Sequence, residues 1–298
     1  MVLSFLLLAK TIFAFGGNKS WLAYLASHFR FQYFVAGIVL FVGLLWLNPL
    51  WSWLPIIPVV INALFLQNKN TEAPRKDLKS ALKVYSANLF IANFHYDKIA
   101  ASIEQSHADV AFVYEIFEDT FQELQKRLPQ YTNNFFIQSP KNLGMAVFTK
   151  YPNATFDAQY LSNPKAGTLV ANVPQHKSMK IAGFHTDAAL TPKKYAGLKA
   201  EIAGLAKLAE ETKEPLLIVG DFNDTTVSAF FQGLFKAGLK DTRTRFQRAV
   251  SWPLFLPRFL GLCLDHALIK NGAHVVNREF GTRTGSDHLP IIVDIAIE

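Results

Sequence analysis

Apolar residues dominate the first 66 positions of the chain and gather there into two long runs. Phe31 to Leu47 and Leu50 to Leu66 are each 17 residues long and contain no charged residue. This length reaches the lower limit, about 17 residues, for a helix that crosses the hydrocarbon core of a bilayer. Between the runs, Asn48 and Pro49 predict a tight turn, set in an aromatic belt of Trp46, Trp51 and Trp53. The pattern predicts a helical membrane hairpin, and the alternative is a buried helical hairpin of a soluble protein.

A shorter apolar segment, Met1 to Phe15, precedes the hairpin and carries Lys10. A truncated span, an interfacial helix and a signal-like segment all fit it, and its sequence does not decide between them. Two or three hydrophobic helices are therefore expected in residues 1–66.

Charged residues mark a boundary after residue 66. Residues 1–66 contain no Asp or Glu and only Lys10, Lys19 and Arg30 as fixed charges. The polar stretch 67–79 predicts a linker, and residues 80–298 have the composition of a globular domain. Positive residues flank both ends of the hairpin, which predicts that this domain lies in the cytoplasm. The single cysteine, Cys263, excludes an intrachain disulfide.

The remaining 27 of the 30 basic residues stand against all 23 acidic ones, so the part after residue 66 carries only about +4. This is a mild bias towards anionic ligands and is low for a dedicated nucleic-acid binder.

After residue 80, short apolar runs typical of strands alternate with helical patterns, which predicts an α/β fold. Helices are expected at about 97–105, 117–128, 193–212 and 229–237, and a hairpin at 135–137 and 145–148. Strands are expected at 82–87, 110–114, 168–173, 179–184, 216–219, 261–264 and 291–297. Polar residues stand where most of these runs end or where the next loop begins: Asn88, Glu115, His185, Asp221 with Asn223, Asp265, and Asp287 with His288.

The run Leu216 to Val219 illustrates the pattern best. Gly220 is expected to allow a tight turn, and Asp221 and Asn223, two apart on an extended chain, are expected to point the same way. A carboxylate and an amide placed together can orient a water molecule and hold an anionic oxygen. Each polar residue alone is more often a turn or a cap, but together they supply oxygen ligands for a hard cation and histidines for proton transfer.

These residues occur in the order of a known family. Asn88 with Asn93, Ala108 to Val110 leading to Glu115, His185-Thr186, Gly220 to Asn223, Leu264 to His266, and Ser286 to Pro290 resemble the endonuclease/exonuclease/phosphatase superfamily in its bacterial membrane-anchored branch. The resemblance implies a DNase I-like, four-layered α/β/β/α sandwich and dependence on Mg²⁺ or Mn²⁺. One departure is Tyr114, which stands before Glu115 where many relatives carry Gln.

The resemblance also implies a role for each residue. Glu115 would be the principal metal ligand, with Asn88 and Asp287 close to the metal. Asp221 would align or deprotonate the attacking water, and Asn223 would hold a phosphate oxygen. His288, oriented by Asp265, would contact the phosphate or shuttle a proton. His185 would serve the leaving group.

The stretch 243–262 is the least family-like loop, and it interleaves arginines with apolar residues. Arg243, Arg245, Arg248 and Arg258 are expected to bind substrate phosphates, while Trp252, Phe255 and Phe259 suit a membrane interface. A loop packed on the domain's own sheet edge is the alternative. The expected partner is the bilayer, with a phosphoester of a membrane lipid headgroup favoured as substrate over DNA or RNA. A catalytically silent scaffold of the same fold and a soluble nuclease remain competing hypotheses.

Overall fold

The computed structural model describes residues 1–138, 144–161 and 168–298. Two six-stranded sheets form the centre of the C-terminal part. The first sheet has the order β11 (Ala273–Phe280), β12 (Ile291–Ile297), β1 (Leu82–Asn88), β2 (Val110–Ile116), β4 (Gly144–Thr149) and β3 (Asn133–Gln138). The second has the order β5 (Thr155–Gln159), β6 (Thr168–Val173), β7 (Met179–His185), β8 (Leu216–Asp221), β10 (Asp265–Lys270) and β9 (Lys240–Asp241).

The two sheets face each other across one apolar core. Alternate strand residues such as Val84 and Phe112 from the first sheet pack with Leu217 and Val219 from the second. The side chains between them, such as Tyr85, point to the opposite face, as the two-residue period of a strand requires. The apolar residues of the strands are therefore buried on both faces, which explains why these runs show little alternation.

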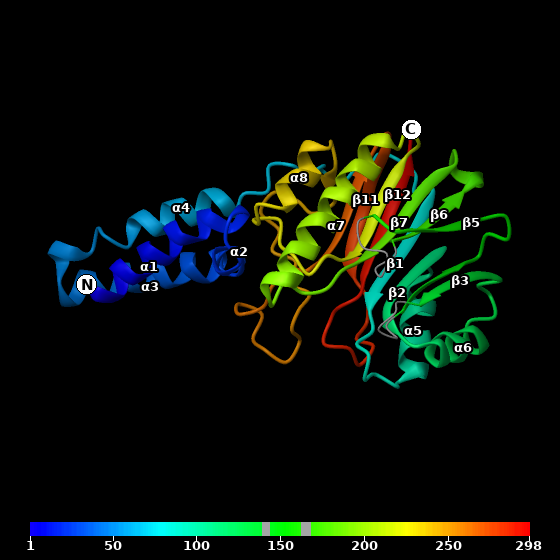
Figure 1. The fold of residues 1–298 in the computed structure, drawn as a ribbon, viewed down its shortest axis with the longest axis horizontal. Helices are drawn as coiled ribbons and strands as arrows, with labels where there is room; N and C mark the ends of the chain where they lie inside the picture. Colours follow the sequence, from blue (N-terminus) through cyan, green and yellow to red (C-terminus); the bar gives the residue numbers. More distant parts are fainter. Residues whose placement is uncertain (139–143, 162–167) are drawn as a thin grey trace.

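Helices cover the outer face of each sheet and complete four layers (Figure 1). The helices α5 (Tyr96–Ser106) and α6 (Glu118–Arg127) pack on the first sheet through Ile99, Ile103 and Leu124. The helices α7 (Pro192–Glu211) and α8 (Phe231–Lys236) pack on the second. The predicted four-layered α/β/β/α sandwich of the DNase I-like kind is confirmed.

One predicted strand is wrong, and others were not predicted. Residues 261–264 are not a strand; β10 begins at Asp265, because it runs antiparallel to β8 and its first residue pairs with the last residue of β8, Asp221. The strands β5, β9 and β11 were missed because polar residues, such as the exposed Thr155, interrupt them and they form no apolar run. The helix expected at 229–237 is shorter, Phe231–Lys236.

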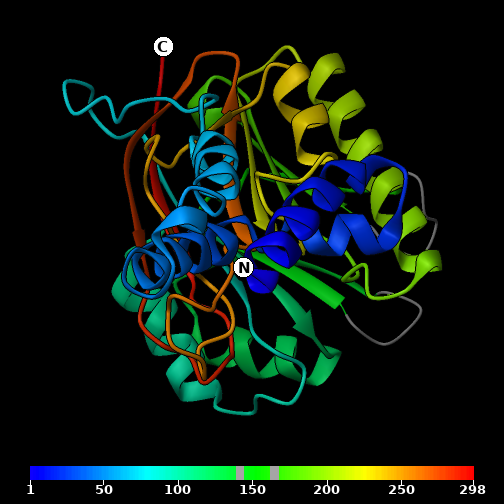
Figure 2. The same cartoon turned by 90° about the vertical axis from the view of Figure 1, so that its left-hand side faces the viewer.

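The N-terminal helices project from one end of the sandwich, as the side view in Figure 1 and the end view in Figure 2 show. They are α1 (Val2–Phe13), the short helix Ala14–Asn18, α2 (Trp21–Ser27), α3 (Arg30–Leu47), the short helix Pro49–Trp51 and α4 (Ile56–Leu66). In the described residues, two segments are long and apolar enough to cross a membrane, Arg30–Leu47 and Pro49–Leu66. The segment Val2–Ser27 would be a third only as a broken span, because it bends by 118°.

The helix α2 does not continue the projecting bundle but lies on the sandwich. Tyr24 is fully buried there, stacked on Phe230 with ring centroids 4.9 Å apart. Trp21 Nε1 donates a 2.7 Å hydrogen bond to the carbonyl of Ala189, and the hydroxyl of Tyr195 donates to the carbonyl of Gly17. The segment around α2 therefore fixes the position of the apolar helices relative to the two sheets.

Candidate active site

The candidate site lies where strands of both sheets end. The parallel strands β1 and β2 bring Asn88 and Glu115 to one end of the first sheet, and the parallel pair β7 and β8 brings His185 opposite Asp221 in the second. Asn88 joins the two sheets, because its Nδ2 donates to Glu115 Oε1 at 2.8 Å and to Asp221 Oδ2 at 2.9 Å. The spacing of apolar runs and polar ends in the sequence thus corresponds to one cluster in space.

A bulge in β2 aims Glu115 at this cluster. The pairing of β2 with β4 shifts register between Tyr114 and Ile116, and Glu115 between them has a left-handed φ of 57°. A bulge of this kind redirects a side chain out of the regular alternation. The strand therefore does not stop at Tyr114, as the sequence predicted, but continues to Ile116.

Gly220 serves close packing of two strands and not the expected turn. It lies inside β8 with a φ of 151°, and a Cβ at this position would come within 1.9 Å of the Phe184 carbonyl oxygen in β7. Only glycine allows this approach, which sets the distance between His185 and Asp221. Asn223 is likewise not extended but left-handed, with a φ of 45°.

The side chains of Asp221 and Asn223 nevertheless converge. The backbone N–H of Asn223 donates to Asp221 Oδ1 at 2.8 Å, and its Nδ2 donates to the Thr186 carbonyl at 2.7 Å. These bonds hold the loop after β8 against the end of β7 and leave Asp221 fully buried.

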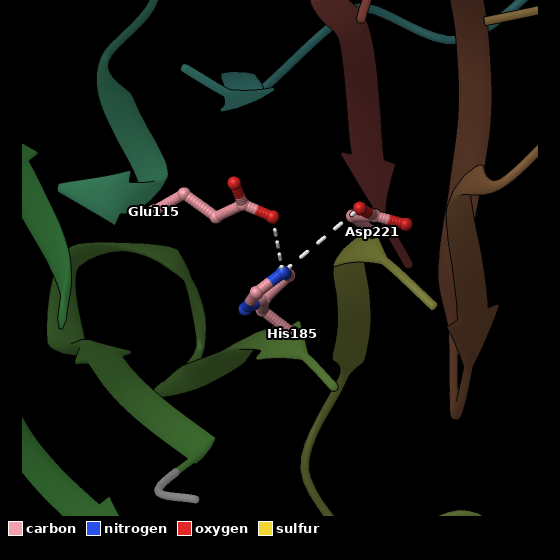
Figure 3. Close-up of side chains that lie close together, drawn as sticks. All are labelled: Glu115, His185 and Asp221. Atoms are coloured by element: carbon pink, nitrogen blue, oxygen red, sulfur yellow. Dashed lines mark ion pairs between the residues drawn. The ribbon is translucent and has the colours of Figure 1, made fainter. Parts of the chain in front are cut away.

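His185 lies between two carboxylates (Figure 3). Its Nε2 is 3.2 Å from Glu115 Oε1 and 4.0 Å from Asp221 Oδ2. Burial alone would lower the pKa of His185, but contact with Glu115 and the charge of Asp221 raise it. Burial would raise the pKa of Glu115, yet the bonds and charge of His185 and the bond from Asn88 hold it at about 2. The lowered pKa of Glu115 and the raised pKa of His185 favour an ion pair between these two side chains, so this position attracts positive charge.

His288 forms the second half of the site. Its Nδ1 is 2.9 Å from Asp265 Oδ2, and its Nε2 is 3.7 Å from Asp221 Oδ2. Burial would lower the pKa of His288, but the charges of Asp265 and Asp221 raise it to about 10. Burial raises the pKa of Asp221 itself. The cluster thus alternates acid and base, which suits proton transfer to and from a bound group.

The same atoms are suited to a divalent cation. Glu115, His185 and Asp221 offer ligand atoms within 4.8 Å of one another, as do Asp221, Asp265 and His288. In the described residues, the buried Asp265 Oδ1 has no hydrogen-bond partner, so this carboxylate oxygen is an acceptor without a donor. Carboxylate and amide oxygens are the ligands that Mg²⁺ and Mn²⁺ accept, so the residues present fit such an ion.

Asp287 is placed differently from its prediction. Its Oδ2 accepts a 2.8 Å hydrogen bond from Trp252 Nε1, and it belongs to neither group of candidate ligands in the described part of the chain. Its role beside the metal remains a prediction. Asn93 is structural, because its Nδ2 donates to the Thr284 carbonyl.

The four arginines of the loop 243–262 are not drawn into this cluster. The prediction for Arg243 is wrong, because its guanidinium is buried in an ion pair with Asp241, 2.6 Å between Nη2 and Oδ2. Arg248 donates to the carbonyls of residues 258, 259 and 261. Arg258 lies over the Phe280 ring and Arg245 bonds to Gln67. A substrate role for Arg245, Arg248 and Arg258 stays a prediction.

Three supporting residues were missed as such in the sequence. The Tyr114 hydroxyl donates to the Val219 carbonyl at 2.8 Å and its ring stacks on His185, so it joins the sheets beneath the site. Ser286 Oγ donates to the Asn88 carbonyl and accepts from the His288 N–H. Trp252 fixes Asp287. In the sequence, the only sign of a supporting role for Tyr114 and Ser286 is that they stand next to the recognised motifs. No local pattern indicates the role of Trp252.

Comparison with known proteins agrees with this geometry. The model of the Endonuclease/Exonuclease/phosphatase family matches residues 86–288, which include every residue of the cluster. The chain therefore belongs to the endonuclease/exonuclease/phosphatase family, as the resemblance predicted. No curated protein matches it in sequence.

Several solved structures share the fold. A family member from Bacteroides vulgatus is 16% identical with a TM-score of 0.61, covering 74% of this chain and all of that one. The mannosyl-6-phosphatase of Bacteroides thetaiotaomicron is 19% identical with a TM-score of 0.55, covering 73% of this chain and all of that one. Zebrafish (D. rerio) TDP2, humanized by 14 mutations, is 15% identical with a TM-score of 0.58, covering 72% of this chain and 98% of that one. At these identities the likeness concerns the fold.

Proposed function

We propose that the protein is a membrane-anchored, divalent-metal-dependent phosphoesterase that hydrolyses a phosphodiester or phosphomonoester at the bilayer surface. The observation that carries the proposal is the cluster in which Asn88 links Glu115 to Asp221, with His185 and His288 on either side. Family membership supports phosphoester hydrolysis. The two apolar segments support the anchor.

In the proposed reaction, Glu115 and Asp221 would hold Mg²⁺ or Mn²⁺ together with Asn88, and Asp287 is the further residue expected near the ion. When bound, the cation would supply charge stabilisation and polarise the phosphoryl oxygens. Asp221 orients the attacking water, and Asn223 turns its amide towards a phosphate oxygen. His288, fixed by Asp265, holds the phosphate, and His185 gives a proton to the leaving oxygen.

A membrane-associated substrate is favoured by the loop 252–261. At its base Trp252 bonds to Asp287, beside His288. Trp252 pairs with Leu262 and closes the loop, and the carbonyls of residues 259–261 next to this pairing accept hydrogen bonds from Gln32 Nε2 in α3. Within the loop, Phe255 and Phe259 are 74% and 56% exposed. Exposed aromatic side chains in a loop that contacts the proposed anchor suit the interfacial region of a bilayer.

Confinement to the membrane raises the effective concentration for a substrate in that surface and does little for chromosomal DNA. We therefore favour a lipid headgroup, or another phosphoester held at the membrane, over nucleic acid.

The test compares hydrolysis rates of the full-length protein, with Mg²⁺, on vesicles of anionic phospholipid or sphingomyelin and on single- and double-stranded DNA. We expect the protein to hydrolyse the lipid and excess chelator to abolish this hydrolysis. The control is His107→Asn. His107 is exposed and has a left-handed backbone conformation that asparagine also adopts, so this variant should hydrolyse substrate at the wild-type rate. Ready cleavage of DNA with untouched lipids would make the protein a tethered nuclease. If no substrate is hydrolysed, the hypothesis of a catalytically silent scaffold of the same fold is the one that remains.

A further inference from the structure

A cavity of about 360 Å³ lies where the apolar helices meet the catalytic domain. Its walls come from the start of α3, the end of α4, residues 225–227 and the loop 243–263. Its volume falls in the range of roughly 300–1,000 Å³ that small-molecule sites occupy. None of the catalytic cluster, from Asn88 to His288, lines it, so it is separate from the candidate active site.

The cavity carries positive charge without a matching negative charge. Its lining includes Arg243, Arg245 and Arg248 but no Asp or Glu. Arg243 is neutralised by Asp241, whereas in the described part of the chain neither Arg245 nor Arg248 has a carboxylate within 4.0 Å. Arg245 uses one nitrogen for Gln67 and keeps its other donors available. Arg248 directs Nη1 and Nη2 at the carbonyls of residues 258, 259 and 261, so it contributes mainly its positive charge to the cavity. A donor-bearing Arg245 and the charge of Arg248 in one lining favour a phosphate group.

The rest of the wall is apolar. Phe34 comes from α3, Ala63 and Leu66 come from α4, and Phe246, 75% exposed, comes from the loop. Arg248 lies over the ring of Phe31 with 3.7 Å between Cζ and the ring centroid. A ligand for this cavity therefore needs an anionic group next to a hydrocarbon group.

The position of the cavity indicates which kind of amphiphilic molecule it would bind. The segments Arg30–Leu47 and Pro49–Leu66 are the two candidate spans, and the cavity lies at the first turn of one and the last turn of the other. In a bilayer, headgroups lie at the ends of spanning helices, and basic side chains there attract anionic lipids.

We propose that this cavity binds an anionic phospholipid as a resident ligand, with its phosphate on Arg245 and Arg248 and its acyl chain along Phe34, Ala63 and Leu66. The proposal rests on the proposed membrane anchor but not on the proposed hydrolysis. The bound lipid would join α3 and α4 to the loop 243–263, next to the contacts of Gln32 with residues 259–261.

The test is lipid retention by the full-length protein in detergent, measured by native mass spectrometry with added dioleoyl phosphatidylglycerol or dioleoyl phosphatidylcholine. EDTA is present throughout, so binding is observed without turnover. Wild type is expected to bind phosphatidylglycerol at least tenfold more tightly than phosphatidylcholine. Arg245→Gln with Arg248→Gln should remove this preference, while Arg258→Gln, an arginine of the same loop outside the cavity, should keep it.

Two further variants separate binding from folding. Arg245→Gln alone leaves the loop carbonyls with their Arg248 bonds and should still weaken phosphatidylglycerol binding severalfold. Ala63→Phe should fill the acyl end and weaken binding of both lipids at an unchanged unfolding temperature. Glycerol 3-phosphate at the same concentration should not displace the lipid.

The proposal is overturned if wild type binds both lipids equally, if Arg258→Gln loses as much preference as the double variant, or if glycerol 3-phosphate competes equally well. The hydrolysis assay on the same preparations is independent. A preparation that hydrolyses phosphoesters without retaining phosphatidylglycerol contradicts the lipid site alone, and the reverse result contradicts the proposed activity alone.

Discussion

The carboxylate of Asp265 holds the imidazole of His288 through a 2.9 Å contact between Oδ2 and Nδ1. The contact leaves Nε2 directed at Asp221, 3.7 Å away. Both acids are buried, and β10 begins at Asp265 directly opposite the end of β8 at Asp221. The antiparallel register of the two strands therefore places the two carboxylates on the two sides of one histidine.

We expect His288→Ala to lower the hydrolysis rate by about 10²- to 10⁴-fold, the usual contribution of an acid–base group. Asp265→Asn should also lower it, because the amide can no longer stabilise the imidazolium. Turnover of the best substrate with Mg²⁺ is the measurement, and circular dichroism should show that both variants fold. Wild-type turnover in either variant contradicts the assigned roles.

Gly220 provides a test of the packing beneath the site. A Cβ there would overlap the Phe184 carbonyl, so Gly220→Ala should push β7 away from β8 and separate His185 from Asp221. We expect a lower unfolding temperature and loss of activity together. Gly233→Ala in α8 is the matched control, because nothing lies within 4 Å of a Cβ added at position 233. Alanine there should leave stability unchanged or raise it by up to about 1 kcal/mol. Equal behaviour of the two variants would contradict this account.

Much of the site could be predicted from the sequence, because polar residues directly follow buried strands. The positions of Asn88, Glu115, His185 and Asp221 depend mainly on where the apolar runs end, which is a local property. The bulge at Glu115 and the pairing of Asp265 with Asp221 depend on neighbouring strands, so local patterns could not give them. Arg243 was misassigned because its partner, Asp241, lies two residues earlier and a turn is needed to bring them together. The attachment of α2 was missed because Tyr24 packs against residues some 170 to 205 positions later in the chain.

A buried pair joins α2 to the loop after the site and predicts a pH effect. His28 Nδ1 is 3.8 Å from Asp224 Oδ1 and 2.9 Å from Thr225 Oγ1. Burial lowers the pKa of His28 to about 4 and raises the pKa of Asp224 to about 7. Folding therefore releases a proton from His28 between about pH 4 and 6.5, and takes one up on Asp224 between about pH 4 and 7. In wild type these two effects nearly cancel over their common range.

Single variants should separate the two effects. In His28→Asn only Asp224 remains, so stability should fall as pH rises from about 4 to 7. In Asp224→Asn only His28 remains, so stability should rise over about pH 4 to 6.5. Each slope is at most about 1.4 kcal/mol per pH unit, the free energy of one proton. Unfolding temperatures measured in detergent across this range provide the test, and equal slopes in both variants would rule out this pairing.

The side of the membrane that holds the catalytic domain can be tested directly. Residues 1–66 carry no acidic residue, while Lys19 and Arg30 precede the hairpin and Lys69, Arg75 and Lys76 follow it. Positively charged flanks tend to stay in the cytoplasm. We therefore expect both ends of the hairpin, and the catalytic domain, to lie on the cytoplasmic side of a bacterial inner membrane. A protease added to intact spheroplasts should leave residues 80–298 whole and should digest them once the membrane is opened with detergent. The turn around Asn48 should behave oppositely: a cysteine replacing the 87% exposed Trp46 should react with an impermeant maleimide in intact cells, after Cys263→Ser removes the native thiol. Digestion of the C-terminal part in intact spheroplasts, with no labelling at position 46, would place the domain on the outer side, where its substrate would have to be sought.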